Sequence, residues 1–598
     1  MIKKETRNKI MIFKNKKASF TLVELIVVVA IIGLLAGIAV AAFNNARVKA
    51  RDVRRIADIS QITKALELSF SFNDSYPNSL GTVCLSVCMD VSPPSWCSTL
   101  LTQMSNIPND PLPTQQCYLY NSDGTNFRIA TTLESSSNQA LAQNDGGNYA
   151  QYFESSSSPG LISLSRNKYA SAVGGNWSSD DGAWVTESGG STITTHPVQG
   201  DTAILDVNSG NITVDTASVT TDIDATGYTH TLALDAGLTV YGNLKFVAGM
   251  TFTPNTQTVT FAATTTGKTI TTGGKTFSSV TWNGNGGEWT LQDHFLQNRV
   301  IAFTSGTLIF NGKSYINGSY GNPITLGSGF TLNVGAGRFI CANAASLTVP
   351  TGATITISTG MIDIINLTVS GTGTFTATNT ANIILWGNLD ITSSNFDAGL
   401  STIYQKYSTT TRSLSSTQSL YNYTVGTGSG SDYNISIVLQ SNLTILNDFA
   451  IQYVAGKIRS FDAGSYTINI GGNFTNDDTF TAGTSTVNFN DATKISTIGD
   501  TSNTTFNNLT STTPDKTIKF KAESTTTVTS LSLTGSSGHL ITMDTDTGAS
   551  TFNLSDSAGT NTLYYTSITR SAAAGGATWN ALISDGNANG GSNSGWNF

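Results

Sequence analysis

The chain contains little charge and few residues of the kinds that usually carry out catalysis. Only 12% of its 598 residues are charged, against about a quarter in an average globular domain. The four histidines are scattered, at His196, His230, His294 and His539. Enzymes that cleave polysaccharides on β-helical scaffolds need clustered carboxylates or an Arg or Lys base. We therefore predict a protein without a catalytic site.

Acidic residues are densest after residue 200, at Asp201, Asp206, Asp215, Asp222 and Asp224. Their spacing suits turns and a solvated face at least as well as an active site. Asp and Asn at such corners could also hold calcium, although no repeated Gly-Asp loop is present. We predict no cofactor, with calcium as the one alternative.

Positive charge is concentrated near the N-terminus. Residues 1–72 hold 13 of the 31 basic residues and only 5 of the 39 acidic ones. The rest of the chain therefore has 18 basic and 34 acidic residues, a net charge of −16. Proteins that bind nucleic acid need a basic surface that neutralises phosphates. We predict no nucleic-acid partner.

One long apolar run lies close to the N-terminus. Seven basic residues precede Phe20, and the 19 residues from Leu25 to Phe43 carry no charge. A helix of that length spans about 28 Å, close to the hydrocarbon thickness of a bilayer. The run predicts a single-pass transmembrane helix. Apolar residues at three- and four-residue spacing, from Val53 to Phe70, extend the predicted helix to residue 72.

The segment Lys16-Lys17-Ala18-Ser19-Phe20-Thr21-Leu22-Val23-Glu24-Leu25 resembles the class III leader of type IV prepilins and pseudopilins. The resemblance implies that a prepilin peptidase removes residues 1–19 by cutting between Ser19 and Phe20, and that Phe20 is then N-methylated. The family pattern has Gly before the cut, where this chain has Ser19. It also implies assembly with other pilin subunits by inner-membrane machinery. The precursor would lie in the inner (cytoplasmic) membrane and the mature chain in an extracellular filament.

Glu24 would be the fifth residue of the mature chain. A carboxylate costs on the order of 2.5–3.5 kcal/mol at mid-membrane and less near one end. Cleavage frees an α-amino group with a reference pKa of about 8, which can neutralise Glu24 of a neighbouring subunit. We predict an assembly role for Glu24; the alternative is a side chain that snorkels at the membrane edge. Gly33 and Gly37 form a GxxxG pair that lets helices pack closely.

Ala39-Val40-Ala41 supports a different processing route, because it has the small-x-small form of an ordinary secretory cleavage site. A cut there would release a soluble protein that begins at Ala42. The apolar run is longer than the roughly 7–15 residues usual for secretory peptides. We therefore favour the prepilin route.

Residues 73–154 are predicted to form an α+β pilin head after the helix of residues 20–72. Four of the five cysteines lie there, at Cys84, Cys88, Cys97 and Cys117. Exported domains mature in an oxidising compartment, so these thiols predict disulfides, with three connectivities open. A zinc site is disfavoured because no histidine is near. Cys341 lies in an apolar strand, where we expect it to be buried.

Residues 155–167 begin with a Ser/Pro/Gly stretch and are predicted to be a linker. From residue 168 to 598, short alternating strands are punctuated by Gly and Asn, and only five prolines follow Gly160. Residues 463–470 recur 19 residues later as 482–489. A small-Asn-apolar triplet also recurs at Gly242-Asn243-Leu244, Gly387-Asn388-Leu389, Ser441-Asn442-Leu443 and Gly472-Asn473-Phe474.

A repeat of about 20 residues predicts a β-solenoid in which each coil covers the core of the next. The predicted fold class is therefore mainly β with a long N-terminal α-helix: a pilin head followed by a right-handed parallel β-helix. Trp596 and Phe598 are expected to cap its last coil. Tandem β-sandwiches are the alternative, since they also give alternating strands of this length.

These features predict a membrane-anchored, prepilin-like structural subunit of a type IV pilus or related filament. The large β-solenoid would be displayed at the cell surface for adhesion, with surface glycans as partners. One alternative is a glycan-active β-helix enzyme on the same anchor. The other is a pseudopilin of type II secretion.

Overall fold

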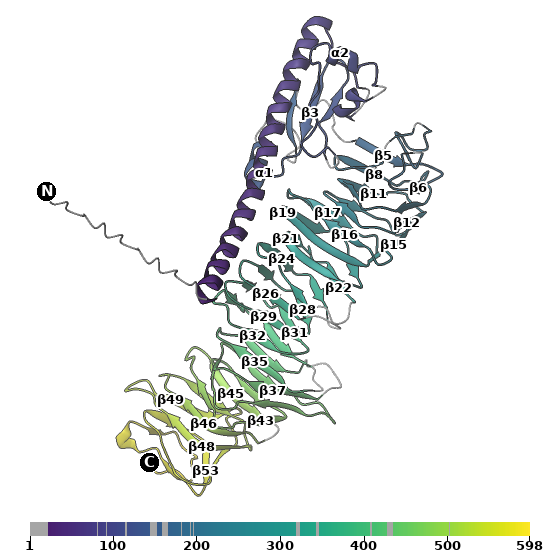
Figure 1. The fold of residues 1–598 in the computed structure, drawn as a ribbon. Coiled ribbons are helices and arrows are strands. Elements are labelled where there is room, and N and C mark those ends of the chain that lie inside the picture. The colour runs from purple at the N-terminus through teal and green to yellow at the C-terminus, as the bar shows by residue number, and fades with distance from the viewer. Residues whose placement is uncertain are drawn as a thin grey trace, which may run out of the picture. The chain divides into compact units, whose positions relative to one another are not determined.

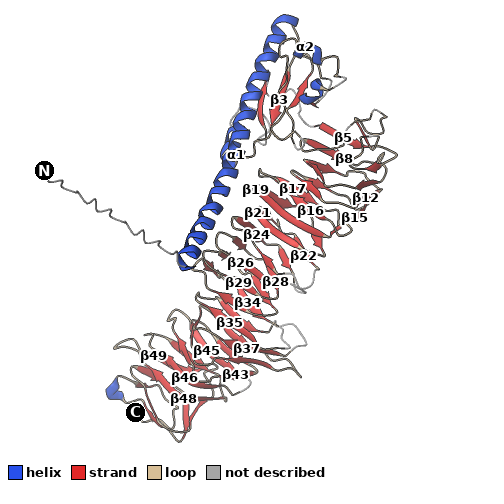
Figure 2. Cartoon of the chain, viewed as in Figure 1, coloured by secondary structure: helices blue, strands red, loops and turns tan. Residues whose placement is uncertain are grey.

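Two compact units make up the chain, one comprising Met1–Pro113 with Cys117–Ser163 and the other Thr114–Gln116 with Leu164–Phe598 (Figure 1). The computed structural model describes residues 22–79, 82–90, 93–113, 116–143, 152–157, 166–180, 182–191, 193–194, 196–318, 323–341, 346–406, 410–426, 434–500 and 503–598. In the first helix it describes side chains from residue 44 onward. Strands make up 45% of the chain and helices 9% (Figure 2). The predicted fold class, mainly β with a long N-terminal helix, is confirmed.

The first unit consists of a long helix and a small antiparallel sheet. Helix α1 (Leu22–Asn73) has 52 residues, and the sheet order is β1-β2-β3-β4. Its strands are β1 (Val83–Cys84), β2 (Leu119–Ser122), β3 (Phe127–Thr131) and β4 (Phe153–Ser156). A 3-10 helix, η1 (Leu85–Met89), and two short helices, α2 (Cys97–Leu101) and α3 (Ser136–Gln143), complete the unit.

The apolar positions of α1 form the core of this unit. Ile59, Ile62 and Leu66 recur at three- and four-residue spacing, so they share one helix face, and each is at most 1% exposed. They belong to the same core cluster as Tyr120 and Ile129 of the sheet. The head therefore folds directly onto the helix that carries the predicted leader.

Strand β4 extends two residues beyond the predicted end of the head. Ser155 and Ser156 pair with Ile129 and Arg128 of β3. Ser157 continues the contact, because its N–H donates to the carbonyl of Phe127 at 3.1 Å. The start of the predicted linker thus belongs to the sheet. Serine is typical of linkers, but its backbone N–H and carbonyl can pair in a ladder like those of other residues.

The second unit is a parallel β-solenoid of about 17 turns. Five of its sheets contain parallel ladders of four to 15 strands in which strands from successive coils pair side by side. Alternate residues are buried along most strands, as in β27 (Thr354–Ile357), β31 (Asn382–Leu385) and β41 (Thr467–Ile470). The predicted parallel β-helix is confirmed, and tandem sandwiches are wrong.

The 19-residue sequence repeat corresponds to one coil. Strand β41 pairs with β44 (Thr486–Phe489), and Ile468 lies against Val487 in that register. Leu443 of β38 (Leu443–Ile445) precedes Ile468 in the same ladder. All three side chains are at most 1% exposed. The alternation of inward aliphatic and outward polar residues therefore repeats because each coil covers the previous one.

Asparagine recurs at the corners because its side chain bonds the next coil. The Oδ1 atoms of Asn243, Asn388, Asn442 and Asn473 accept the N–H groups of Thr269, Ser413, Thr467 and Thr497 at 2.9–3.0 Å. A further triplet, Gly210-Asn211-Ile212, makes the same bond to the N–H of Thr231 at 2.9 Å. A backbone donor at a turn needs such a partner when it leaves the ladder. The triplet is thus a structural link between coils.

Tryptophans close both ends of the solenoid core. Trp177 and Trp184 are fully buried at the first coil, with ring centroids 4.9 Å apart. Trp596 and Phe598 pack, partly buried, against the last coil, and the Trp596 ring lies 5.2 Å from that of Trp579. A stacked core needs such covers because its end coils have a neighbour on one side only.

On one face of the solenoid, one sheet ends midway and a second sheet begins. The sheet that begins at β7 (Trp184–Val185) ends at β33 (Phe396–Asp397), whereas the sheet β38-β41-β44-β46-β48-β50-β53 begins at β38. The coil between them contributes only an isolated bridge from Leu420 to Ile445. The sheet β23-β26-β29-β32-β35-β37-β40-β43 runs past this break without interruption. The break therefore lies beside a continuous ladder.

Candidate functional site

The predicted processing and assembly residues lie at the start of the chain. Ser19 and Phe20 lie outside the described residues. Glu24, Gly33 and Gly37 lie within the backbone of α1, but their side chains are outside the described part. Cleavage, N-methylation and charge pairing at these positions therefore stay predictions.

Within the described ranges, no helix has a stretch that is both long and apolar enough to cross a membrane.

A buried ion-pair cluster joins α1 to the head. The guanidinium of Arg55, 0% exposed, donates from Nε and Nη2 to both carboxylate oxygens of Asp110 at 2.7 and 2.9 Å. It also donates to Asp52 at 3.0 Å and to Glu134. Asp52 in turn accepts the N–H groups of Glu134 and Ser135 at 2.8 Å each, at the start of α3. One arginine of the helix thereby fixes two loops of the head.

The charge of Glu134 depends on this cluster. Burial opposes its ionisation, but hydrogen bonds from Arg51 and Arg55 outweigh that effect and lower the pKa of the carboxyl. The sequence did not reveal this network, because Arg51, Asp52 and Arg55 look like solvated residues of an amphipathic helix. Only the folded head brings Asp110 and Glu134 onto them.

Two disulfides close the head, between Cys84 and Cys117 and between Cys88 and Cys97. They enclose sequence separations of 33 and 9 residues. The sequence left three connectivities open, and the structure has this one. Cys341 of the solenoid is free and buried, and burial raises the pKa of its thiol.

The acidic residues after position 200 accept hydrogen bonds, either within a turn or from a neighbouring coil. Asp206 Oδ1 accepts the N–H of Asn208 at 2.9 Å, Asp215 accepts both the N–H and hydroxyl of Ser178, and Asp222 accepts the N–H of Asn243. Asp201 and Asp224 accept backbone N–H groups of Val198 and Thr226 in the same way. Within the part of the chain that the structure describes, no three His, Cys, Asp or Glu side chains are grouped to hold a metal ion.

Lys516 is a buried ammonium inside the solenoid. Its Nζ donates to the carbonyls of Gly471, Asp491 and Lys494 at 2.8–3.0 Å. Burial lowers its pKa to about 8, against the opposing attraction of Asp491. All three bonds go to backbone atoms of neighbouring coils, so the lysine ties coils together.

Two columns of polar side chains run along the continuous ladder. They lie on, or one residue before, β26 (Leu347–Val349), β29 (Leu367–Val369), β32 (Leu389–Ile391) and β35 (Arg412–Ser416). The register stacks the buried side chains of Leu347, Leu367, Leu389 and Leu414. One column consists of the residues just before these leucines and the other of the residues just after them. We call the two columns together the polar strip. The first column is Ser346, Asn366, Asn388 and Ser413, and the second is Thr348, Thr368, Asp390 and Ser415.

Hydrogen bonds between coils hold the first column in place. Asn366 Nδ2 donates to Ser346 Oγ at 2.8 Å, and Asn366 Oδ1 accepts the N–H of Asn388 at 2.6 Å. Seven residues of the strip, with Leu389, line a shallow groove of about 390 Å³. The strip is thus a pre-formed row of hydroxyl and amide groups.

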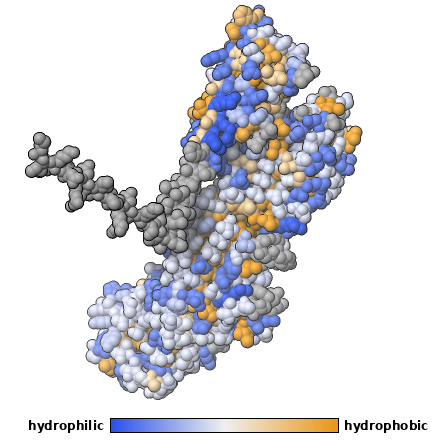
Figure 3. Space-filling model, viewed as in Figure 1, coloured by the Kyte–Doolittle hydropathy of each residue, from blue (hydrophilic) through white to orange (hydrophobic). Residues whose placement is uncertain are grey.

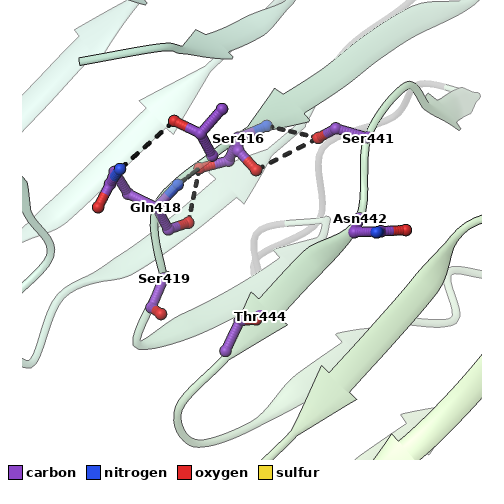
Figure 4. A pocket seen from close by; sticks show the side chains of 7 residues that line it. Ser416, Gln418, Ser419, Ser441, Asn442 and Thr444 are labelled. Carbon is purple, nitrogen blue, oxygen red and sulfur yellow. Dashed lines mark hydrogen bonds between the residues drawn. The ribbon is translucent and has the colours of Figure 1, made fainter. Parts of the chain in front are cut away.

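A second groove, of about 290 Å³, lies where β35 ends (Figure 4). It is lined by Ser416, Thr417, Gln418, Ser419, Ser441, Asn442 and Thr444. Ser416 and Ser441 are joined by two hydrogen bonds, because the Ser416 N–H donates to Ser441 Oγ at 2.9 Å and that hydroxyl donates back to the Ser416 carbonyl at 3.2 Å. Gln418 and Ser419 lie in the coil that contributes no strand to the neighbouring sheet. The groove forms at this break.

Both grooves are polar and nearly uncharged, since Asp390 is their one ionisable side chain. The face of the C-terminal coils that the space-filling view draws is mostly pale, with scattered hydrophilic patches (Figure 3). Sequence reasoning identified Asn388 and Asn442 only as corner residues. The repeated polar-Leu-polar pattern could have predicted the strip, had the register of the coils been known.

A family model matches the N-terminal part of the chain. Residues 14–40 match the prokaryotic N-terminal methylation motif, which supports a type IV pilin-like leader. No curated protein and no solved structure matches the chain.

Proposed function

We propose that the protein is a minor or tip subunit of a type IV pilus or related filament, anchored in the membrane as a precursor, and that its solenoid mediates adhesion. The match of residues 14–40 to the N-terminal methylation motif carries this proposal. The α1 helix that follows supports a small, disulfide-closed α+β head. Such a head suits an exported subunit, because disulfides form in oxidising compartments.

Processing would create the assembly contact. Cleavage before Phe20 frees an amino group that is largely protonated at neutral pH. Glu24 of the next subunit can then be neutralised in a low-dielectric environment, where an unpaired carboxylate is costly. A prepilin peptidase and other pilin subunits are therefore the partners that the proposal requires.

A minor position in the filament follows from size. The solenoid unit covers Leu164–Phe598, several times the length of the head it follows. If every subunit carried it, these domains would crowd around the filament. A subunit at the tip, or one incorporated rarely, leaves each solenoid room to meet a surface.

Two other functions compete with this one. A type II secretion pseudopilin would share the leader and the head. A glycan-active enzyme on the same anchor is less favoured, because the acidic residues after position 200 accept structural hydrogen bonds within turns and between coils.

Mass spectrometry of the mature N-terminus tests the proposal. We expect a chain that begins at Phe20 and carries one N-methyl group. A mature start at Ala42 would instead indicate ordinary secretion and contradict a filament role. Glu24→Ala should leave membrane insertion intact, because the segment becomes more apolar, and should reduce incorporation into filaments; Glu24→Asp is the matched control that keeps the charge.

A further inference from the structure

We infer that the polar strip and the groove at the end of β35 form one binding site for an uncharged, hydroxyl-rich glycan chain. This inference rests on the proposed adhesive function and specifies its ligand. The two grooves adjoin along β35: Ser413 and Ser415 line one, and Ser416 begins the other. The strip itself spans four coils, a length of about 14 Å at the spacing of neighbouring strands. That length accommodates several sugar residues across the coils.

The chemistry of the lining matches sugar hydroxyls. Ser, Thr, Asn and Gln side chains offer both donors and acceptors, and a sugar hydroxyl also acts as both. Asn442 uses its Oδ1 for the N–H of Thr467. Its Nδ2 has no hydrogen-bond partner among the described residues, and the residue is exposed. Donors of this kind are therefore available to a ligand.

The rigidity of the polar strip favours its use as a binding site. The column of Ser346, Asn366, Asn388 and Ser413 is linked by hydrogen bonds from coil to coil. Beneath it the stacked leucines are buried, so the strands cannot shift independently. A pre-organised row of polar groups loses less entropy on binding than mobile side chains do.

An aromatic residue two positions before the strip in the chain is fixed by contacts with the neighbouring coils. Trp386 lies two residues before Asn388, and its indole N–H donates to Asp363 at 2.5 Å. Lys406 Nζ lies 4.1 Å from the centroid of the ring and 3.3 Å from Asp363 Oδ2. The ring and its two charged neighbours are therefore held in place just before β32.

Other ligand classes fit less well. Anionic polymers would meet the exposed Asp390 and the net negative charge of the coils. An extended peptide usually adds to a free strand edge, but β29, β32 and β35 are paired on both sides. Leu389, the one apolar lining residue, is buried, so no pocket awaits an apolar side chain.

The test uses the full chain in detergent and an immobilised panel of neutral, sialylated and sulfated oligosaccharides. The variant Thr368→Ala/Asp390→Ala/Ser415→Ala removes three of the four side chains of the column that follows the leucines. The matched control is Thr356→Ala/Thr376→Ala/Asp397→Ala, which removes register neighbours on β27, β30 (Thr374–Ala377) and β33. Both sets point outward, so circular dichroism should match that of the wild type, and the control should lose only the small stabilisation from the hydrogen bond of the Gly399 N–H to Asp397.

We expect saturable binding to neutral oligosaccharides, weakened about tenfold or more by the strip variant and unchanged by the control. Binding that is equal in the wild type and the strip variant would overturn the site. Binding confined to sulfated or sialylated probes, or absent from the whole panel, would overturn the ligand class. Neither outcome affects the filament proposal, because the mature N-terminus is measured independently.

Discussion

The head closes a small core with two disulfides and a buried ion-pair cluster, whereas the solenoid has no disulfide among its described residues and stacks apolar side chains coil upon coil. The difference follows from size. A small head buries a smaller fraction of its surface than a large domain does, so disulfides and ion pairs contribute a larger share of its stability. In a stacked array each added coil contributes its own interface. The head should therefore be sensitive to redox state and pH, and the solenoid to defects in its ladders.

The largest effect is expected from a charge placed inside a solenoid ladder. Ile468→Asp puts a carboxylate between Leu443 and Val487, where no partner is present, and should lower the free energy of unfolding by about 4 kcal/mol or more. Hydrogen exchange of the full chain, read peptide by peptide, should show lost protection in the coils around residues 443–489 and none in the head.

Thr467→Asp is the control for that substitution. Thr467 is the adjacent residue of β41 and faces outward, so a charge there stays solvated. A head that lost protection together with the coils would show that the two units fold as one. The head and the solenoid would then not be stabilised independently of each other.

Opening one disulfide alone should have the next largest effect. Opening the 33-residue separation between Cys84 and Cys117 removes about 3–4 kcal/mol by loop entropy, and the shorter Cys88–Cys97 loop about 2–3 kcal/mol. With reductant, hydrogen-exchange protection should fall in the head and stay unchanged in the coils. Cys84→Ala/Cys117→Ala should reproduce the larger share, and Cys341→Ala, outside both bridges, should not respond to reductant differently from the wild type.

The acid response of the head should depend on Glu134. Its pKa is lowered in the folded state, so ionised Glu134 stabilises the head above its unfolded value of about 4.5. That stabilisation is lost as the pH falls through the lower, folded value. Glu134→Gln should be less stable than the wild type at pH 7 and should lose less further stability between pH 5 and pH 3. Equal slopes for both proteins would contradict the role given to the ion pairs.

Sequence reasoning predicted the parts of this molecule whose signals are local and failed where contacts are distant. The helix and the 19-residue coil could be predicted because periodicity is visible along the chain, as in Ile468 and Val487. The Arg55 cluster could not, because Asp110 and Glu134 are 55 and 79 residues away from it. The polar strip needs a register between coils of unequal length, since Leu347, Leu367, Leu389 and Leu414 are 20, 22 and 25 residues apart.

The smallest effect is expected at a corner asparagine. Asn211 Oδ1 accepts the N–H of Thr231 from the next coil, and the side chain is exposed. Asn211→Ala leaves this donor to water, so unfolding should become easier by only about 0.5–1 kcal/mol. Asn211→Asp retains an acceptor oxygen and should stay near the wild type in urea-induced unfolding. A loss in Asn211→Asp as large as that in Asn211→Ala would show that the corner depends on the amide group itself and not on its acceptor. The coil-to-coil bond would then have no part in the stability of the solenoid.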